Sequence, residues 1–241
     1  MRTILWFIYF WLYLIVIFPI FVYTRHLGRK GEREKHDRLT RKVVGNWARR
    51  LIRLAGAQVT VEGLENLPEG PAVYVANHLG YFDIPLMLGY LGNDTKPLVA
   101  KKEIKKIPLI RGWMEELHCV FIDRENPRAS VAALGEAADW VSQGYSMVIF
   151  PEGTRSKTSE LGEFKGGAFK IAQKNKVAVV PCCISGTENL MERNGYWIRP
   201  AKIALKVLPA IETEGYARED WRALPALAEQ KVREGLAEMP H

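Results

Sequence analysis

A chain of 241 residues is long enough to build one substantial hydrophobic core. Its three cysteines, Cys119, Cys182 and Cys183, are too few for a disulfide scaffold and lack metal-ligand spacing, so we expect reduced thiols and no metal site. The formal net charge of +7 is concentrated in residues 25–53, which carry eleven Lys or Arg against three acidic residues and leave the rest of the chain close to neutral.

Residues 4–24 form an uncharged, apolar run. As a helix with a rise of ~1.5 Å per residue they would span ~30 Å, the thickness of a hydrocarbon core, so we expect a membrane anchor. A signal peptide fits less well, because the run is long and aromatic and lacks a small-residue cleavage site before Arg25. Pro19 can kink the helix or split it into a re-entrant pair, and both arrangements stay open. The Lys and Arg that follow place the body of the protein in the cytoplasm.

Residues 38–54 combine a basic face with apolar residues at helical spacing. The apolar positions are Leu39, Val43, Val44, Trp47, Leu51, Ile52 and Leu54. This pattern favours an amphipathic helix that lies on anionic lipid, although a helix packed on the body of the protein would show the same spacing. Nucleic-acid binding is the alternative for a basic segment, and it is not expected here because the segment directly follows a membrane anchor.

The remainder of the chain alternates strand-like and helix-like stretches. We predict strands at 58–62, 72–76, 97–100, 119–122, 147–150, 177–184 and 203–208, and helices at 84–91, 101–114, 128–143, 166–174 and 224–237. This alternation is typical of an α/β fold, here with a mixed, largely parallel sheet flanked by helices and an N-terminal membrane-anchoring helical segment. We therefore divide the chain into an anchor with a basic amphipathic helix, residues 1–57, and an α/β domain, residues 58–241.

His78 and Asp83 lie in the turn between the strand at 72–76 and the helix that follows. An imidazole moves protons near neutral pH, and a nearby carboxylate fixes its tautomer and stabilises the imidazolium. Residues five apart on one helix lie about 140° apart around its axis, whereas on a turn that leads into a helix they can meet. The alternative is a polar turn in which Asn77 or Asp83 caps the helix.

Polar residues also follow three other predicted strands. Glu152, Gly153 and Arg155 follow the strand at 147–150, Arg124 follows the strand at 119–122, and Lys101 follows the strand at 97–100. Open α/β sheets bind ligands at the carboxyl ends of strands, and Arg suits a phosphate. A His, its carboxylate and several cations in one cleft fit proton transfer at a phosphorylated substrate. For residues 150–156 the alternative is a surface turn with a local salt bridge. The sequence has no P-loop, so nucleoside triphosphate chemistry is not expected.

Four motifs occur in one order along the chain. They are N-H-x-x-x-x-D at 77–83, F-I-D-R at 121–124, F-P-E-G-T-R-S at 150–156 and V-P at 180–181. In this combination and spacing, the chain resembles the 1-acyl-sn-glycerol-3-phosphate acyltransferases of the bacterial PlsC type over residues 64–208. In that family a Gly usually stands three residues before the Phe of the second motif. Here His118 takes that position, and it either alters the substrate pocket or points away from it.

The resemblance implies a reaction and assigns residues to it. A fatty acyl group would pass from a thioester of coenzyme A or acyl carrier protein to the sn-2 hydroxyl of lysophosphatidic acid, giving phosphatidic acid. The implied catalytic residues are His78 and Asp83, and the implied substrate-binding residues are Asn77, Lys101, Phe121, Arg124, Glu152, Gly153, Thr154 and Arg155. The resemblance implies no metal, no cofactor beyond the acyl donor, and no nucleic-acid partner. It also implies a bacterial inner-membrane enzyme, with the lipid bilayer as partner and the catalytic domain on the cytoplasmic face.

A direct transfer fits these residues best. We predict that Asp83 holds the imidazole while His78 takes the proton of the acceptor hydroxyl, and that Lys101, Arg124 and Arg155 neutralise the phosphate. The sequence has no G-x-S-x-G motif, so a covalent acyl-enzyme is not expected. Three alternatives stay open: a related acyltransferase that uses glycerol 3-phosphate or another lysolipid, a membrane thioesterase in which His78 activates water, and a non-catalytic membrane adaptor.

Overall fold

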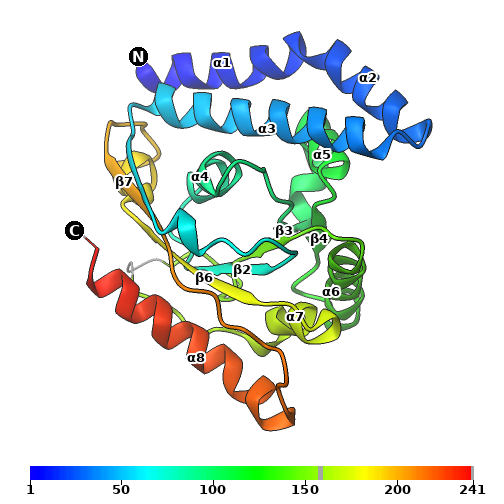
Figure 1. The fold of residues 1–241 in the computed structure, drawn as a ribbon. Coiled ribbons are helices and arrows are strands. Elements are labelled where there is room, and N and C mark those ends of the chain that lie inside the picture. Colours follow the sequence, from blue (N-terminus) through cyan, green and yellow to red (C-terminus); the bar gives the residue numbers. More distant parts are fainter. Residues whose placement is uncertain (157–159, 240–241) are drawn as a thin grey trace.

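A mixed, largely parallel β-sheet forms the centre of the protein. The computed structural model describes residues 1–156 and 160–239 (Figure 1). Five strands lie in the order β1 (Gln58–Glu62), β7 (Lys202–Val207), β6 (Val179–Ser185), β2 (Val73–Ala76) and β5 (Met147–Ile149). β3 (Val99–Lys101) and β4 (Val120–Ile122) pair in parallel and continue the sheet beyond β5, because Leu98 bridges Val148 in parallel. Among the strand pairs described, β6–β7 alone is antiparallel, which confirms the predicted fold class.

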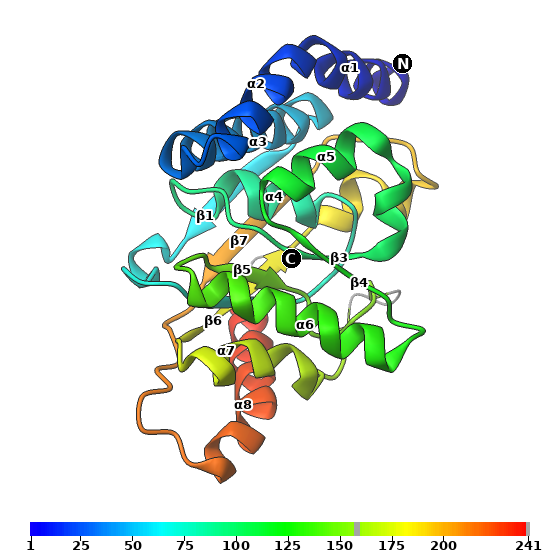
Figure 2. The same cartoon turned by 90° about the vertical axis from the view of Figure 1, so that its right-hand side faces the viewer.

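Helices cover both faces of the sheet, and the inner strands send their side chains alternately into two cores, one on each face. One layer comprises α3 (Arg33–Ala55), α4 (Asp83–Tyr90) and α5 (Pro108–Glu116), and the other comprises α6 (Pro127–Ser142), α7 (Lys170–Asn175) and α8 (Arg218–Ala237) (Figure 1, Figure 2). On β2, Tyr74 and Ala76 enter the core of the first layer, whereas Val73 and Val75 enter the core of the second. α1 (Arg2–Val16) and α2 (Phe18–Arg29) lie over α3 (Figure 1).

The predicted strands and helices occur in the predicted order, but three helices differ in extent. The stretch 101–114 is a 3₁₀ turn, η2 (Lys102–Lys106), followed by α5, because Pro108 has the backbone angle of a first helical residue and begins a new helix. The stretch 166–174 divides into η3 (Gly166–Phe169) and α7. α8 begins at Arg218 because the Asp220 carboxylate accepts the Ala217 N–H at 2.8 Å, and Pro225 therefore lies inside the helix. Further 3₁₀ turns are η1 (Leu64–Asn66), η4 (Thr187–Leu190) and η5 (Glu192–Asn194).

The apolar N-terminal run forms two helices. α1 ends at Val16 and α2 begins at Phe18 with Pro19 in its first turn, and the two helices are bent by 47° relative to each other. Among the described residues, no single helix has the length and apolar composition to cross a membrane, but this bent pair has both. On the inner side of α1, the Trp6 indole donates to the Leu51 carbonyl of α3 at 2.9 Å. The membrane-anchoring role of the pair stays a prediction, as does the division of the chain after residue 57.

The basic helix α3 lies on the body of the protein. Its apolar residues Val44, Ala48, Leu51 and Ile52 are buried, and α3 packs mainly against α4. The apolar face therefore contacts protein, which confirms the packed-helix alternative, and a contact of this basic helix with anionic lipid stays a prediction. The basic face stays in solvent, where the Arg38 side chain is 70% exposed.

A buried polar network fastens α3 to α5 and to the loop that precedes β5. The Asp37 carboxylate of α3 accepts the Tyr145 hydroxyl at 2.6 Å and lies 2.9 Å from His36 Nδ1 and 3.4 Å from His118 Nε2. The other ring nitrogen of His36, Nε2, lies 2.9 Å from Glu116 Oε2 of α5. Burial alone would raise the pKa of Asp37, but hydrogen bonds from His118, Tyr145 and His36 outweigh burial and lower the pKa well below its usual range. Asp37 is thus the shared acceptor of this junction.

Replacing Asp37 with Asn should destabilise the protein by about 3 kcal/mol at pH 7, because the change breaks a buried ionic network. Thermal melting in detergent measures the loss. Since the folded-state pKa is lowered, the stabilisation is present above about pH 4, the usual value of an Asp, and is lost as the pH falls toward the folded-state pKa. The difference in melting temperature between wild type and Asp37→Asn should therefore become smaller as the pH falls below about 4.

Asp94→Asn is the matched control for this prediction. Arg41 lies 3.5 Å from Asp37 and 3.2 Å from Asp94, so both carboxylates pair with it. The Asp94 side chain is 68% exposed, however, so its loss should change the free energy of unfolding by less than about 0.5 kcal/mol. Equal melting temperatures for Asp37→Asn and Asp94→Asn at pH 7 would contradict the role given to Asp37.

Candidate active site

The carboxyl ends of the parallel strands bring the predicted residues to one edge of the sheet. His78 follows β2, residues 152–155 follow β5, and Thr187 follows β6. Lys101 ends β3, and Arg124 follows β4. This edge is where open α/β sheets bind ligands, because the connecting loops gather there and leave a crevice.

His78 and Asp83 form a hydrogen-bonded pair. His78 Nδ1 lies 2.7 Å from Asp83 Oδ2, and Asp83 is the fully buried first residue of α4. The same oxygen accepts the backbone N–H groups of Leu79 at 2.6 Å and Gly80 at 2.9 Å, and Thr187 Oγ1 donates to the other oxygen. Because a carboxylate only accepts, Nδ1 of His78 is the donor, and in a neutral imidazole Nε2 then keeps the lone pair that a general base needs.

Glu152 supports the turn that carries His78. Its Oε1 accepts the backbone N–H of His78 at 2.8 Å, and its Oε2 accepts the N–H of Gly162 at 3.1 Å. The His78 ring also stacks on Phe150, with ring centroids 4.2 Å apart. Burial raises the pKa of Glu152, and the two backbone hydrogen bonds oppose that rise. Both carboxylate oxygens of Glu152 therefore accept backbone N–H groups, and Glu152 forms no contact with Arg155 among the described residues.

Arg155 is joined to the turn of His78 through Tyr81. The guanidinium lies 4.0 Å from the centre of the Tyr81 ring, and Nη2 donates to the Tyr81 hydroxyl at 3.3 Å. Its acidic partner is Glu192, at 3.6 Å from Nη1. Gly153 has a φ of 76°, as expected for a residue that turns the chain sharply here, and Thr154 is exposed beside it. A phosphate next to His78 would thus meet a half-exposed, planar cation.

Lys101 and Arg124 lie further along the same edge. At ~4.8 Å between strands, the strand of Lys101 is roughly 10 Å and the strand of Arg124 roughly 14 Å from the strand of His78. Lys101 pairs with Glu103 at 3.4 Å, and Arg124 forms no salt bridge with a described residue. Burial lowers the pKa of Arg124. The structure gathers these cations at one edge but does not bring them into contact with the His78–Asp83 pair.

Two further predicted residues make contacts within the protein. The side-chain amide of Asn77 donates to the Ile184 carbonyl at 2.9 Å and accepts the Ile184 N–H at 2.8 Å, so it fastens β2 to β6. The Phe121 ring lies under Lys105, whose Nζ is 4.9 Å from the ring centre. Lys105 is a cation at this edge that sequence reasoning did not single out.

His118 points away from the His78–Asp83 pair. Its ring stacks on Trp140 of α6 with centroids 4.1 Å apart and belongs to the Asp37 network. Its φ of 64° lies in the left-handed region, where glycine costs least, so a glycine would also suit this position. The structure therefore supports the alternative in which His118 points away from the substrate pocket.

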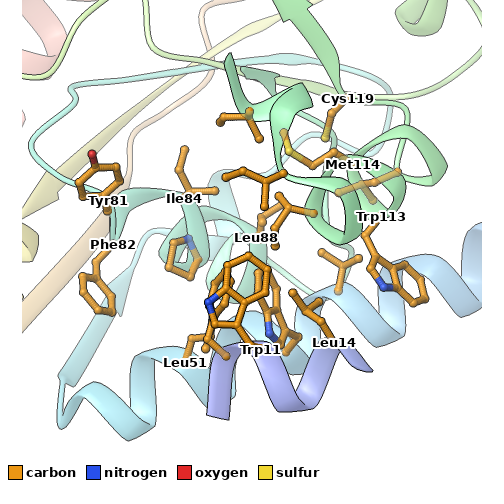
Figure 3. Close-up of a pocket in the computed structure, with 18 of the residues that line it drawn as sticks. Trp11, Leu14, Leu51, Tyr81, Phe82, Ile84, Leu88, Trp113, Met114 and Cys119 are labelled. Carbon is orange, nitrogen blue, oxygen red and sulfur yellow. The ribbon is translucent and has the colours of Figure 1, made fainter. Parts of the chain in front are cut away.

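An apolar cavity adjoins the turn of His78. It has a volume of about 510 Å³ and is lined by side chains from α1, α3, α4 and α5. Tyr81 and Phe82 lie at one end and Trp113 at the other (Figure 3). Small-molecule pockets commonly have ~300–1,000 Å³, so the cavity is large enough for an extended apolar ligand. The same Tyr81 that borders the cavity stacks on Arg155, so an apolar and a cationic region meet at this side chain.

One group of residues has the composition of a metal site. His36, Asp37 and His118 place one ligand atom each within 4.8 Å of one another. Both ring nitrogens of His36 already contact carboxylates, and Arg41 lies 3.5 Å from Asp37. A cation there would displace these contacts and meet an arginine, so the group fits an internal ionic network better than a metal centre.

Besides Lys105, sequence reasoning missed three residues of the site, Thr187, Tyr81 and Glu192, and it also missed the cavity. Thr187 was within reach, because it follows a predicted strand at the same edge as the other polar residues. Tyr81 and Glu192 gave no local signal, because their hydrogen bond joins positions 111 residues apart. The cavity depends on α1 and α3 packing over α4 and α5, which no local pattern specifies.

The geometry defines a class of protein: an α/β fold that places a His–Asp pair beside an apolar cavity and a phosphate-suited arginine. The chain belongs to the Acyltransferase family, whose family model matches residues 58–185.

Similar proteins bear consistent names. The crystal structure of the 1-acyl-sn-glycerophosphate acyltransferase PlsC from Thermotoga maritima superimposes with a TM-score of 0.77 at 30% identity, covering 99% of this chain and 97% of that one. A chloroplastic 1-acyl-sn-glycerol-3-phosphate acyltransferase of Arabidopsis thaliana is 44% identical over 56% of this chain and 38% of its own length. One from Saccharomyces cerevisiae is 34% identical over 69% of this chain and 55% of its own length. The chain thus spans about half the length of the curated relatives it matches.

Proposed function

We propose that the protein transfers a fatty acyl group from a thioester to the sn-2 hydroxyl of 1-acyl-glycerol-3-phosphate, giving phosphatidic acid. The observation that carries the proposal is the His78–Asp83 pair, whose turn borders the apolar cavity and contacts Arg155. An acyl chain suits the cavity, and a phosphate suits the guanidinium. The names of the similar proteins from Thermotoga, Arabidopsis and yeast agree with this reaction.

In the proposed reaction, His78 Nε2 takes the proton of the acceptor hydroxyl while the hydroxyl oxygen attacks the thioester carbonyl carbon. The new C–O bond forms, the C–S bond breaks, and the imidazolium gives its proton to the departing thiolate. Asp83 keeps the ring oriented and stabilises its charged form. General-base catalysis of this kind contributes about 10²–10⁴-fold. The thioester supplies the activation, so we expect no cofactor, and acyl-coenzyme A and acyl carrier protein both fit as donors.

The cations and the loop residues hold the acceptor in this scheme. Arg155 is the main ligand of the phosphate, and Lys101 and Arg124 add positive charge further along the same edge of the sheet. Asn77, Phe121, Glu152, Gly153 and Thr154 stay proposed substrate-side residues, with Asn77 and Glu152 acting through the backbone that they hold. Positioning of this kind is worth several orders of magnitude in rate when the reacting atoms are brought within reach.

The bent helix pair is the proposed contact with the lipid bilayer. The outer side of α1 exposes Ile4, Leu5, Ile8, Leu12, Ile15 and Val16, all at least 55% exposed. An apolar face of this extent on a helix next to a basic segment fits a helix that lies in the membrane interface. The inner side of α1 lines the cavity, so a lipid substrate has a short path from the bilayer. We place the α/β domain on the cytoplasmic face of a bacterial inner membrane.

An acyl-transfer assay tests the function. Detergent-purified protein with acyl-coenzyme A or acyl carrier protein should form phosphatidic acid from lysophosphatidic acid, and His78→Ala should lower kcat by about 10²–10⁴-fold. Glycerol 3-phosphate and neutral lysolipids are the competing acceptors. Transfer to one of these would change the substrate and keep the mechanism. Thioester hydrolysis without transfer, still dependent on His78, would mean a thioesterase, and no His78-dependent reaction would leave the adaptor alternative.

Filling the cavity should shorten the acyl chain that the protein accepts. Leu88→Phe adds bulk at a cavity-lining position. At ~0.8 kcal/mol for each buried methylene, exclusion of two methylenes should lower kcat/KM for long-chain substrates about tenfold and leave short chains unchanged. Leu227→Phe on α8, 37% exposed and outside the cavity, is the matched control. An equal loss for long and short chains would speak against the cavity as the chain site.

Charges on the outer face of α1 should weaken membrane binding. The double variant Leu12→Asp/Ile15→Asp replaces two exposed apolar side chains and should lower partition into phospholipid vesicles at least tenfold, because each buried side chain contributes about 1.5–3 kcal/mol. Vesicle flotation measures this partition. Val131→Asp on α6, where Val131 is 63% exposed, is the control and should bind like wild type. Unchanged flotation of the double variant would exclude this face as the membrane contact.

A further inference from the structure

Glu192 lies beside the turn of His78 and has no part in the reaction proposed above. It begins η5, after β6, and its side chain is 17% exposed. Glu192 Oε1 accepts the backbone N–H of Tyr81 at 2.6 Å, a short, charge-assisted hydrogen bond. Oε2 is buried and has no hydrogen-bond partner among the described residues. Keeping a carboxylate oxygen unpaired in this place is costly, so its position needs an explanation.

The turn leaves room for this carboxylate at Gly80. A Cβ added to Gly80 would lie 2.7 Å from Glu192 Oε2 and 2.8 Å from Oε1, closer than real Cβ atoms approach. The backbone of Gly80 does not need glycine for its own sake, because its φ is not positive. Glycine at position 80 therefore lets the Glu192 carboxylate keep this place, whereas a side chain there would push the flexible end of Glu192 aside.

Glu192 acts on Arg155 by two routes. The direct contact is long, 3.6 Å, and the Arg155 side chain is 36% exposed, so water weakens it. The indirect route runs through Tyr81, whose backbone Glu192 holds and whose ring and hydroxyl hold the guanidinium. The short bond to the Tyr81 N–H makes the indirect route the stronger one.

We propose that Glu192 is a positioning residue for the acceptor. By holding Tyr81 it fixes the Arg155 guanidinium, and thereby the place of the acceptor phosphate relative to His78. Tyr81 also lines the cavity, so the same contact aligns the site of the head group with the site of the acyl chain. The inference rests on the proposed function, because it takes Arg155 as a phosphate ligand. A guanidinium that is no longer held in place binds the phosphate less well in the ground state and in the transition state alike, and this loss raises KM.

A second effect of Glu192 opposes the first. Its negative charge repels a phosphate bound at Arg155, so removing the charge alone favours binding. Two substitutions separate the effects. Glu192→Gln removes the charge but keeps an oxygen that accepts the Tyr81 N–H, whereas Glu192→Ala removes both the charge and the hydrogen bond. Positioning predicts that these two variants differ, and charge alone predicts that they agree.

The experiment measures steady-state transfer by the full chain in detergent, with lysophosphatidic acid varied at saturating acyl-coenzyme A. Glu192→Ala should raise KM for lysophosphatidic acid about tenfold, the scale of one lost hydrogen bond to a charged group, with kcat within threefold of wild type. Glu192→Gln should have a KM within threefold of wild type. Glu229→Ala is the matched control, because Glu229 on α8 also accepts a backbone N–H, from Phe164 at 3.0 Å, and pairs with Arg233 at 2.8 Å.

Gly80→Ala tests the same contact from the other side. The added methyl group displaces the carboxylate while Glu192 remains, so KM should rise as in Glu192→Ala, including in a case where Glu192→Ala fails to fold. The double variant Gly80→Ala/Glu192→Ala should have a KM no higher than that of the more impaired single variant, because both substitutions remove the same contact between Glu192 and Tyr81.

Three results would overturn the inference while leaving the proposed function intact. They are equal KM values for Glu192→Gln and Glu192→Ala, a lower KM in Glu192→Ala than in wild type, and single effects that multiply in the double variant. A wild-type protein that forms no phosphatidic acid would overturn the proposed function and this inference with it.

Discussion

The candidate site depends on how the buried carboxylate of Asp83 is satisfied. A carboxylate with no exposed surface is tolerated only when donors surround it. Here two backbone N–H groups, the Thr187 hydroxyl and His78 Nδ1 fill that role, and Asp83 also begins α4, where the helix dipole favours negative charge. The donors come from the end of β2 and the end of β6. The position of the imidazole is therefore fixed by the turns that directly follow two neighbouring strands of the sheet.

Under the proposed function, Tyr81 connects this rigid pair to the two regions that a lysophospholipid would need. Its ring borders the apolar cavity on one side and carries the Arg155 guanidinium on the other. The residue lies between His78 and Asp83 in the sequence, so the turn that holds this pair also forms the boundary between apolar and cationic surface. An amphipathic acceptor would have its two ends sorted by one side chain, with its hydroxyl between them near His78.

Much of the fold and the centre of the site follow from local sequence. The strands are short apolar runs, and His78 and Asp83 are close enough in the chain for a single turn to bring them together. Long-range packing did not follow from local sequence. The spacing of residues 38–54 fits a helix on lipid and a helix packed on protein equally well, and only the structure shows the packed face. Glu192 reaches Tyr81 only because the chain after β6 returns beside the turn of His78, and no periodicity reports such a return.

The N-terminal helices show why the cavity could not be read from sequence. Residues 4–24 are apolar on all sides, and that composition alone points to a lipid surround. In the structure the inner residues Trp6 and Leu14 are buried against the protein, and the outer residues stay exposed. One apolar run thus has two environments, which hydropathy cannot distinguish. The inner side of α1 lines the cavity next to α4. Removal of α1 would therefore open the proposed acyl-chain site and also remove the proposed membrane contact. Under the proposed function, lipid access and acyl-chain binding are consequently properties of the same helix.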